Sequence, residues 1–468
     1  MAKRTLIISV AVILALSIIL GGLIFMTVKQ MNNCTSDTIT SATQSATQIN
    51  EGGPGETPPG MSGGSVSYSA ANEITESSTV SEKTYKSETK DENALLVGGE
   101  IEVTATGITA SKTGDSSGGD NANFYGTNSA VIAKDGATLT IDNATITTDA
   151  SGANGVFSYG GNGGQNGASG DNTTVIISDS TITTTGSGSG GIMTAGGGIT
   201  KASNLNVTTS GQSSAAIRSD RGGGTVTVDK GTYTTNGLGS PAIYSTADIT
   251  VSDATLVSNL SEGVCIEGLN SITLKNCDLT ANNTQRNSNA QFLDSIMIYQ
   301  SMSGDAASGT SAFTMTGGSL KSLSGHVFHV TNTSAVINLS AVNITNEDSD
   351  NILLSVCDDG WSGGSNTATL NASKQELNGA ILVGSNSTLT LNLSDSSTFT
   401  GLINGKITNA SGDTVSSEVG TVSVTLEGGS TWSLTGDSYV TSFTGDASSV
   451  IGNGYTLYVN GTALEGTK

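Results

Sequence analysis

The sequence predicts an all-β fold, a parallel β-helix solenoid of about 13 rungs preceded by one N-terminal transmembrane helix and a disordered tether. Three observations predict it. A long apolar run comes first, a segment rich in Ser, Thr, Gly and Pro follows, and one short block then recurs along the rest of the chain. These observations divide the chain into residues 1–34, 35–94 and 95–468.

Residues 1–34 have the composition of a membrane anchor. After Lys3 and Arg4, residues 5–28 form an apolar run without a charged residue. The run is long enough for a helix to cross a bilayer core of about 30 Å, and it is longer than the apolar core of most cleaved signals. We expect a single-pass protein of the cell membrane, anchored through residues 5–28, with its C-terminal part extracellular. A cleaved signal or lipid attachment at Cys34 is the alternative.

Residues 35–94 have the composition of a tether. Residues 35–50 are rich in Ser, Thr and Gln, and residues 51–60 hold three of the four prolines. Residues 81–93 are charged and nearly free of apolar side chains. Such a segment buries too little apolar area to offset the entropy that folding costs. We therefore expect a disordered stalk.

From about residue 95 the chain repeats one block, in which an apolar residue precedes a short polar turn and a second apolar residue follows five positions later. Clear copies span residues 141–146, 177–182, 228–233, 251–256, 274–279, 315–320, 339–344 and 459–464. Several copies begin about 23 residues apart. A recurring period in this range is typical of a solenoid.

Each block contains the bend between two short strands. Alternation before it, as in residues 138–141, is typical of a strand with one buried face. The Asn, Asp and Gly residues of the block tolerate the left-handed backbone of a tight turn. A third short strand follows, as in residues 155–157 and 264–266. Such rungs leave no room for a helix, and we expect the longer intervals to carry outward loops.

Composition excludes several classes of function. The chain of 468 residues has 18 Lys+Arg and 40 Asp+Glu, for a net charge of −22. Nucleic acid is therefore not an expected partner, because neutralising phosphates requires clustered basic residues. Four cysteines are too few for a disulfide scaffold. We expect Cys265 and Cys277 to be buried free thiols, with a disulfide as the alternative. We predict no metal and no cofactor, and leave Ca²⁺ open.

The chain from about residue 93 onward resembles a family of exported β-helix proteins of gut Firmicutes, which have a single-pass or a lipid anchor. Residues 120–128, 154–160, 215–224, 299–305 and 452–460 carry the resemblance. The family looks like adhesins or carbohydrate-binding surface proteins with a pectin-lyase-like, right-handed β-helix. The resemblance covers about four-fifths of the chain and implies a right-handed coil and a binding function.

Aligning the third strands predicts one outward column of side chains. Each member follows an apolar residue, so strand alternation directs it away from the core. The column includes Arg218, Tyr244, Glu267, Tyr299 and His329. We expect the first four on consecutive rungs, about 4.8 Å apart. Aromatic faces and fixed hydrogen-bonding groups suit a glycan, so this column is the predicted ligand-binding groove. The alternative is an ordinary solvent-facing column.

Asp358, Asp359 and Trp361 form a second candidate site, a loop at a rung boundary that suits a Ca²⁺ ion or a stacking ligand. The same carboxylate pair raises a rival function, a polysaccharide lyase or glycoside hydrolase of the pectin-lyase-like fold. Hydrolases of this fold combine paired aspartates with a later Gly-His-Gly and Arg-x-Lys. Here His326 precedes the pair, and no arginine follows Arg286. We therefore predict no catalytic residue and no enzyme activity.

Threonine ladders suggest a third class of function, the binding of ice or mineral. Thr-x-Thr pairs recur, for example at residues 145–147 and 181–183. A regular array needs equal rungs, and the unequal intervals argue against it. The prediction is thus a membrane-tethered extracellular β-helix that binds a glycan, or the surface of a host or neighbouring cell, without catalysis.

Overall fold

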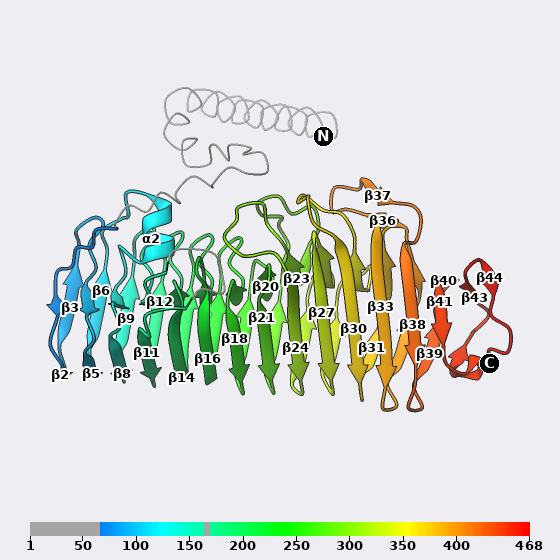
Figure 1. Ribbon diagram of the computed structural model, residues 1–468, viewed down its shortest axis with the longest axis horizontal. Helices are drawn as coiled ribbons and strands as arrows, with labels where there is room; N and C mark the ends of the chain where they lie inside the picture. The colour runs from blue at the N-terminus through cyan, green and yellow to red at the C-terminus, as the bar shows by residue number, and fades with distance from the viewer. Residues whose placement is uncertain (1–65, 163–168) are drawn as a thin grey trace, which may run out of the picture. The chain divides into compact units, whose positions relative to one another are not determined.

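The computed structural model describes residues 66–162 and 169–468. These residues coil through three walls of parallel strands, as Figure 1 shows. Wall 1 is a parallel sheet of 13 strands, and walls 2 and 3 are the two halves of a 22-stranded sheet. A rung runs from wall 1 to wall 2, bends into wall 3 and returns to wall 1. The predicted all-β class and parallel β-helix are confirmed. The last predicted copy of the block, residues 459–464, is not a rung, because Val459 pairs with Thr462 in an antiparallel hairpin.

The strands of the three walls have the following bounds. Wall 1 consists of β1 (Glu73–Ile74), β4 (Leu95–Gly98), β7 (Val131–Lys134), β10 (Val156–Tyr159), β13 (Ile192–Ala195), β15 (Ile217–Ser219), β17 (Ile243–Ser245), β20 (Val264–Glu267), β23 (Asp294–Tyr299), β26 (His326–Thr331), β29 (Ile352–Val356), β32 (Ala380–Val383) and β35 (Ile403–Asn404). Wall 2 consists of β2 (Ser78–Ser81), β5 (Glu102–Thr106), β8 (Thr138–Asp142), β11 (Thr174–Ser178), β18 (Asp248–Ser252), β21 (Ser271–Lys275), β24 (Thr310–Thr316), β27 (Thr333–Ser340), β30 (Asn366–Ser373), β33 (Ser387–Ser394), β38 (Thr421–Leu426) and β41 (Ser442–Thr444). Wall 3 consists of β3 (Thr84–Ser87), β6 (Thr109–Lys112), β9 (Thr145–Thr148), β12 (Thr181–Thr184), β19 (Thr255–Ser258), β22 (Asp278–Ala281), β25 (Ser319–Ser322) and β28 (Asn343–Asn346).

A few elements join or extend the walls. The long strands β14 (Gly198–Thr209) and β16 (Gly224–Thr235) run through both wall 2 and wall 3. A four-stranded sheet continues after β28 with β31 (Glu376–Asn378), β34 (Thr398–Gly401), β39 (Thr431–Leu434) and β42 (Val450–Ile451). The remaining elements are the helix α2 (Gly119–Tyr125), the hairpin β36 (Ile407–Thr408) and β37 (Thr414–Ser416), the strands β40 (Ser438–Val440), β43 (Leu457–Val459) and β44 (Thr462–Ala463), and the 3-10 turn η1 (Ala447–Ser449).

Residues with a left-handed backbone make the bend between walls 2 and 3. Asn143, Asp179, Asp253 and Asn276 have φ values of 54°, 48°, 53° and 51°. They are the Asn and Asp residues of the repeated block, and their side chains tolerate this left-handed conformation. The predicted turn is therefore confirmed at the position where the block placed it.

Apolar side chains stack inside the coil from one rung to the next. In wall 2, Val226, Ile249, Ile272, Phe313 and Ile337 follow one another in register, and all are buried. Each rung thus covers the apolar face of the next one, as in other solenoids. Because alternation directs the intervening residues outward, the polar half of each strand forms the outer surface.

The predicted boundary between tether and β-helix at residue 94 is wrong. Strands β1, β2 and β3 lie before it and pair with the second rung. Tyr85 is buried in the core, and Ile74 and Val80 pack against it. A terminal rung covers the core from one side only, so few apolar residues suffice. The predicted anchor and the first part of the tether, up to residue 65, lie outside the described residues.

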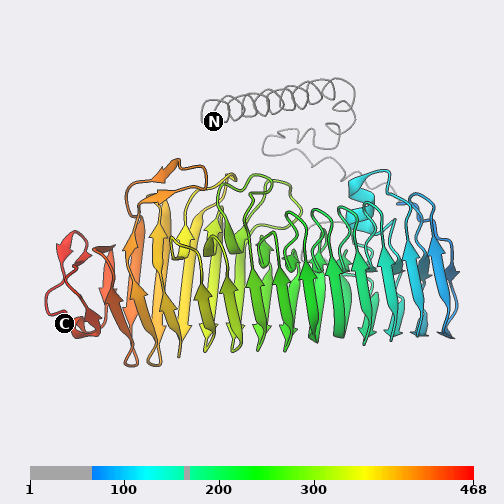
Figure 2. The same ribbon diagram turned by 180° about the vertical axis from the view of Figure 1, so that it is seen from behind.

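The structure also contains a helix that the rung pattern did not predict. Helix α2 lies in the loop between β6 and β7 and ends at Gly126, whose φ is 72°. Figure 2 shows that α2 and the hairpin β36–β37 project from the same edge of the coil. The extra residues of the long intervals lie in such loops, as predicted. In the part of the chain that the structure describes, no helix is long and apolar enough to cross a membrane.

Candidate functional site

The predicted outward column is divided between two columns of wall 1. Arg218 pairs with Tyr244, and the same column reaches His329 through β20 and β23. Glu267 and Tyr299 pair with each other in the neighbouring column. The prediction that four of these residues stand in one line is therefore wrong. A slip of two residues keeps every side chain on its face, so alternation does not detect it.

These columns do not form an open groove. His329 is completely buried and Glu267 is 1% exposed. Loop segments cover them, with residues 300–309 over Glu267 and residues 282–293 and 357–365 over His329. The expectation of a solvent-facing ligand stripe is thus wrong, because loops inserted at the ends of wall-1 strands fold back over the wall.

Glu267 lies in a cage of hydroxyl groups. Its Oε2 accepts hydrogen bonds from the phenols of Tyr244 (2.5 Å) and Tyr299 (3.2 Å), and its Oε1 accepts one from Ser301. Burial raises the pKa of the carboxyl, and the three hydrogen bonds oppose this. Trp361, from the predicted loop site, packs on Tyr299 with 4.9 Å between ring centroids. The structure therefore brings Trp361 to the predicted column.

Arg218 is held in an ion pair beside this cage. Its Nη2 lies 2.8 Å from Oδ2 of Asp220, whose side chain is 4% exposed. Burial raises the pKa of Asp220 to about 7, although the positive charge of Arg218 opposes the rise. This ion pair and a hydrogen bond of 3.3 Å from Nη1 to the backbone carbonyl of Ser213 hold Arg218, whose side chain is 12% exposed.

His329 belongs to a buried network with Ser355. Its Nε2 lies 3.1 Å from Oδ2 of Asp359 and its Nδ1 lies 2.7 Å from Oγ of Ser355. Nδ1 of His326 lies 2.7 Å from the same oxygen. All four side chains are buried, so a substrate in solvent does not contact the serine in this structure. Burial lowers the pKa of His326 to about 3, and the neighbouring His329 contributes to the decrease.

The carboxylates of the predicted loop site diverge. Asp359 is turned inward and accepts from the backbone N–H of Gln291 (2.7 Å). Asp358 is exposed and accepts from Nδ2 of Asn366 (2.6 Å). The carboxylates of Asp358 and Asp359, which were predicted to share one ligand, therefore lie in different environments, the first exposed and the second buried. In the described part of the chain, no group of three His, Cys, Asp or Glu residues suits a metal ion.

A second pair of acids lies buried at the start of the wall-1 strands. Register places Glu262 beside Asp294, two residues before the paired Val264 and Ile296. Glu262 accepts from Ser261, whereas Oδ1 of Asp294 has no hydrogen-bond partner. Burial raises the pKa of both carboxyls, and repulsion from Glu262 raises the pKa of Asp294 further. The pair is not visible in the sequence, because Glu262 and Asp294 are 32 residues apart and come together only through the register of β20 and β23.

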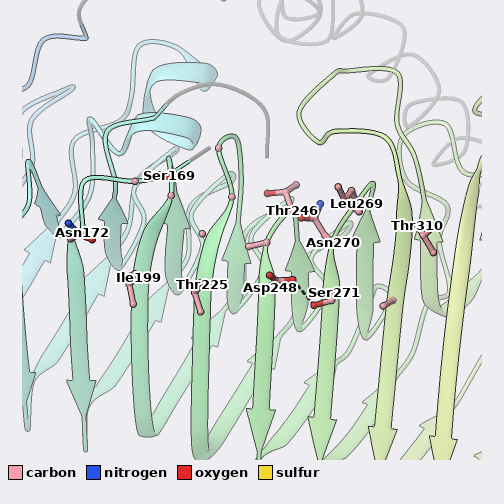
Figure 3. A pocket seen from close by; sticks show the side chains of 17 residues that line it. Ser169, Asn172, Ile199, Thr225, Thr246, Asp248, Leu269, Asn270, Ser271 and Thr310 are labelled. Atoms are coloured by element: carbon pink, nitrogen blue, oxygen red, sulfur yellow. Dashed lines mark hydrogen bonds between the residues drawn. The ribbon is translucent and has the colours of Figure 1, made fainter. Parts of the chain in front are cut away.

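An open groove lies at the start of the wall-2 strands, as Figure 3 shows, and is named groove 1. It has a volume of about 590 Å³ and extends from the turn before β11 to β24. Its floor is one column in register, formed by Ile199, Thr225, Asp248, Ser271 and Ala312. Ser271 donates a hydrogen bond of 2.6 Å to Oδ1 of Asp248, which orients that carboxylate.

The turns between walls 1 and 2 form the rim of groove 1. Leu269 stands on the rim and is 52% exposed. A smaller hollow of about 320 Å³ adjoins groove 1 along the coil, lined by Met302, Ser334 and Ser362 among others. Met302 is likewise exposed. The exposed side chains of Leu269 and Met302 therefore border groove 1 and the smaller hollow, respectively.

The comparisons with known proteins give no assignment. No protein-family model, curated protein or solved structure matches the chain. The site therefore has to be judged on its own residues.

The repeat itself contained the signal for groove 1. Thr225, Asp248 and Ser271 each stand three positions before the first apolar residue of their block. Aligning the blocks therefore places them in one column. An alignment of the third strands alone does not bring these residues together.

Two smaller expectations have clear outcomes. Cys265 and Cys277 are buried free thiols, as expected. The argument that unequal intervals break the threonine ladders is wrong, because the extra residues lie in loops. Wall 3 pairs Thr147 with Thr183, and the column continues in register through Thr208 to Thr234. Threonine is also a favoured strand residue, so the ladder by itself does not indicate a ligand.

Proposed function

We propose that this protein is a membrane-tethered surface protein whose right-handed β-helix binds glycans without catalysis. The observation that carries the proposal is groove 1, an open channel across several rungs, whose floor is polar at Thr225, Asp248 and Ser271 and whose rim has an exposed leucine. Sugars combine apolar C–H faces with hydroxyl edges, so they match an aliphatic rim beside carboxylate, amide and hydroxyl groups. Binding pockets generally pair apolar surface with a few placed polar groups.

The polar groups of groove 1 suit sugar hydroxyls. Asp248 accepts hydrogen bonds only, Thr225 both donates and accepts, and both side chains are exposed. Repetition at the rung spacing of about 4.8 Å offers such groups along the coil. A ligand with several hydroxyl-bearing units therefore gains contacts on each rung.

Binding rather than cleavage is favoured by the carboxylates. Glycoside hydrolysis usually requires two carboxyl groups on either side of the scissile bond. Among the described residues that line groove 1, Asp248 is the single carboxylate. The alternative function, a polysaccharide lyase or hydrolase, therefore has less support in this groove than a binding protein.

The tether and the handedness rest on general arguments. The uncharged apolar run at residues 5–28 supports a single membrane anchor and an extracellular coil. Connections between parallel strands are right-handed in about 98% of cases, which supports a right-handed coil. The resemblance to carbohydrate-binding surface proteins points the same way.

Binding of the full-length protein, purified in detergent, to an array of glycans tests the proposal. The double variant Asp248→Ala plus Leu269→Ala should lose the signal, because it removes the polar floor and the apolar rim together. The matched control, Thr145→Ala plus Thr181→Ala, changes exposed residues of wall 3 and should bind normally. Equal binding by wild type and the groove variant would contradict the proposal.

A further inference from the structure

A second groove, named groove 2, lies over the far half of wall 2 and contains a ladder of asparagine side chains. Asn338, Asn371 and Asn392 follow one another in register and form this amide ladder. Nδ2 of Asn338 donates to Oγ1 of Thr314 (3.1 Å). Nδ2 of Asn371 then donates to Oδ1 of Asn338, and Nδ2 of Asn392 to Oδ1 of Asn371, each at 2.9 Å.

The amide ladder leaves hydrogen-bonding capacity toward the groove. A side-chain amide has two N–H donors and an oxygen with two lone pairs. In Asn371 the ladder uses one donor and one lone pair. The other donor and the other lone pair recur in the same orientation on each rung, because the strands are parallel and in register. The side chains are half-buried, and groove 2 has a volume of about 510 Å³.

A column of hydroxyl groups runs beside the amide ladder. Thr316, Ser340, Ser373 and Ser394 follow one another in register two positions further along each strand. They line the same groove. Among the described residues lining groove 2, Glu427 is the single charged side chain. The lining is therefore almost neutral, on a chain whose net charge is −22.

The spacing of the two columns selects among extended polymers. Rungs lie about 4.8 Å apart, whereas equivalent residues of an extended peptide recur about every 6.7 Å, two residues of 3.3–3.4 Å each. A peptide along the coil axis therefore loses register after one or two rungs. A polymer of pyranose rings linked across the ring advances by close to one rung per sugar. Each of its rings also carries hydroxyls that both donate and accept hydrogen bonds.

We propose that groove 2 binds a linear, uncharged polysaccharide along the coil axis, with about one sugar facing each rung. Charged polysaccharides fit less well, because the groove offers no cation to hold a carboxylate and the acidic chain repels polyanions. This inference concerns a different surface from groove 1 and stands or falls independently of it.

Titration calorimetry of the full-length protein with cello-oligosaccharides of increasing length tests this inference. Affinity should rise with each added sugar until the chain spans the groove, and then level off. The variant Asn371→Ala plus Asn392→Ala should weaken the longest oligosaccharide about tenfold or more, since it removes at least two hydrogen bonds of about 1 kcal/mol each. The control Thr250→Ala plus Thr273→Ala, in the same column before the groove, should bind as wild type does.

Three results would overturn the inference. The first is an affinity that does not depend on oligosaccharide length, and the second is normal binding by the variant Asn371→Ala plus Asn392→Ala. The third is tighter binding of an oligogalacturonate than of the neutral chain of equal length. If the double alanine variant fails to fold, Asn392→Gln, which keeps an amide but displaces it, provides the same comparison. The second of these results, together with loss of cello-oligosaccharide binding in the groove 1 variant, would assign this ligand to groove 1 and leave the proposed function standing.

Discussion

The phenol of Tyr244 donates a hydrogen bond of 2.5 Å to the carboxylate of Glu267, on the next rung of wall 1. The two residues stand in different outward columns, and Tyr299 reaches the same oxygen. Groups that resemble a sugar-binding stripe in the sequence thus satisfy one another beneath a loop. Their role in this structure is to hold the loop at residues 300–309 against wall 1.

Replacing Glu267 should therefore destabilise the fold. Glu267→Ala leaves three hydroxyl groups without their acceptor, and each buried, unsatisfied donor costs about 1–3 kcal/mol. Glu267→Gln keeps an acceptor oxygen and should lose less. Thermal or urea unfolding measures the difference. An alanine variant as stable as wild type would show that the cage does not hold the loop.

The buried carboxyl of Asp220 should make stability depend on pH. Burial raises its pKa from 3.8 to about 7, so the folded state binds this proton more tightly than the unfolded state does. Its contribution is complete below pH 3.8 and is lost as the pH rises through about 7. Relative to Asp220→Asn, wild type should lose stability over this range. A constant difference between wild type and Asp220→Asn over this range would contradict the prediction.

The bend between walls 2 and 3 should be most strained where it lacks a suitable residue. Ala341 occupies the bend with a φ of 54°, where most other rungs have Asn, Asp or Gly, although Lys230 and Lys374 also stand at this position. Ala341→Asn should raise the free energy of unfolding by about 1 kcal/mol, because asparagine tolerates the left-handed region better. The reciprocal change Asn143→Ala should lower it by a similar amount. Chemical denaturation of both variants checks the signs, and a loss of stability in Ala341→Asn would argue against strain at the bend.

The first rung should contribute to stability although its composition resembles that of a tether. Strands β1, β2 and β3 cover the rung that contains Leu95 and Val103. A chain that begins at residue 95 should therefore unfold at a lower temperature than one that begins at residue 66, since it exposes buried apolar surface. Calorimetry compares the two. Equal midpoints would restore the boundary that composition predicted.

The architecture could be predicted from the sequence because it is local. Alternation gives each strand a buried face, and the Asn or Asp of the block gives the bend, as at Asn143 and Asp253. The first rung was missed because a terminal rung needs few apolar residues. Register was missed by two residues at β20, where Val264 and Ile266 are equally apolar.

The candidate site was less predictable because its accessibility depends on loops. Phe292, Ser301 and Trp361 come from insertions whose direction no strand periodicity encodes. These loops bury the predicted column and leave grooves 1 and 2 open on wall 2. Both grooves were nevertheless encoded in the repeat, since Asp248 and Asn371 occupy constant positions relative to their blocks.

Amide hydrogen exchange of the full-length protein, with and without a glycan that it binds on the array, tests most directly that wall 2 is the binding surface. The account predicts slower exchange in the groove 1 turns at residues 222–225, 246–248 and 269–271, and unchanged exchange in the covered strands β20 and β26. Protection confined to those wall-1 strands or their covering loops, with none at the groove 1 turns, would contradict it.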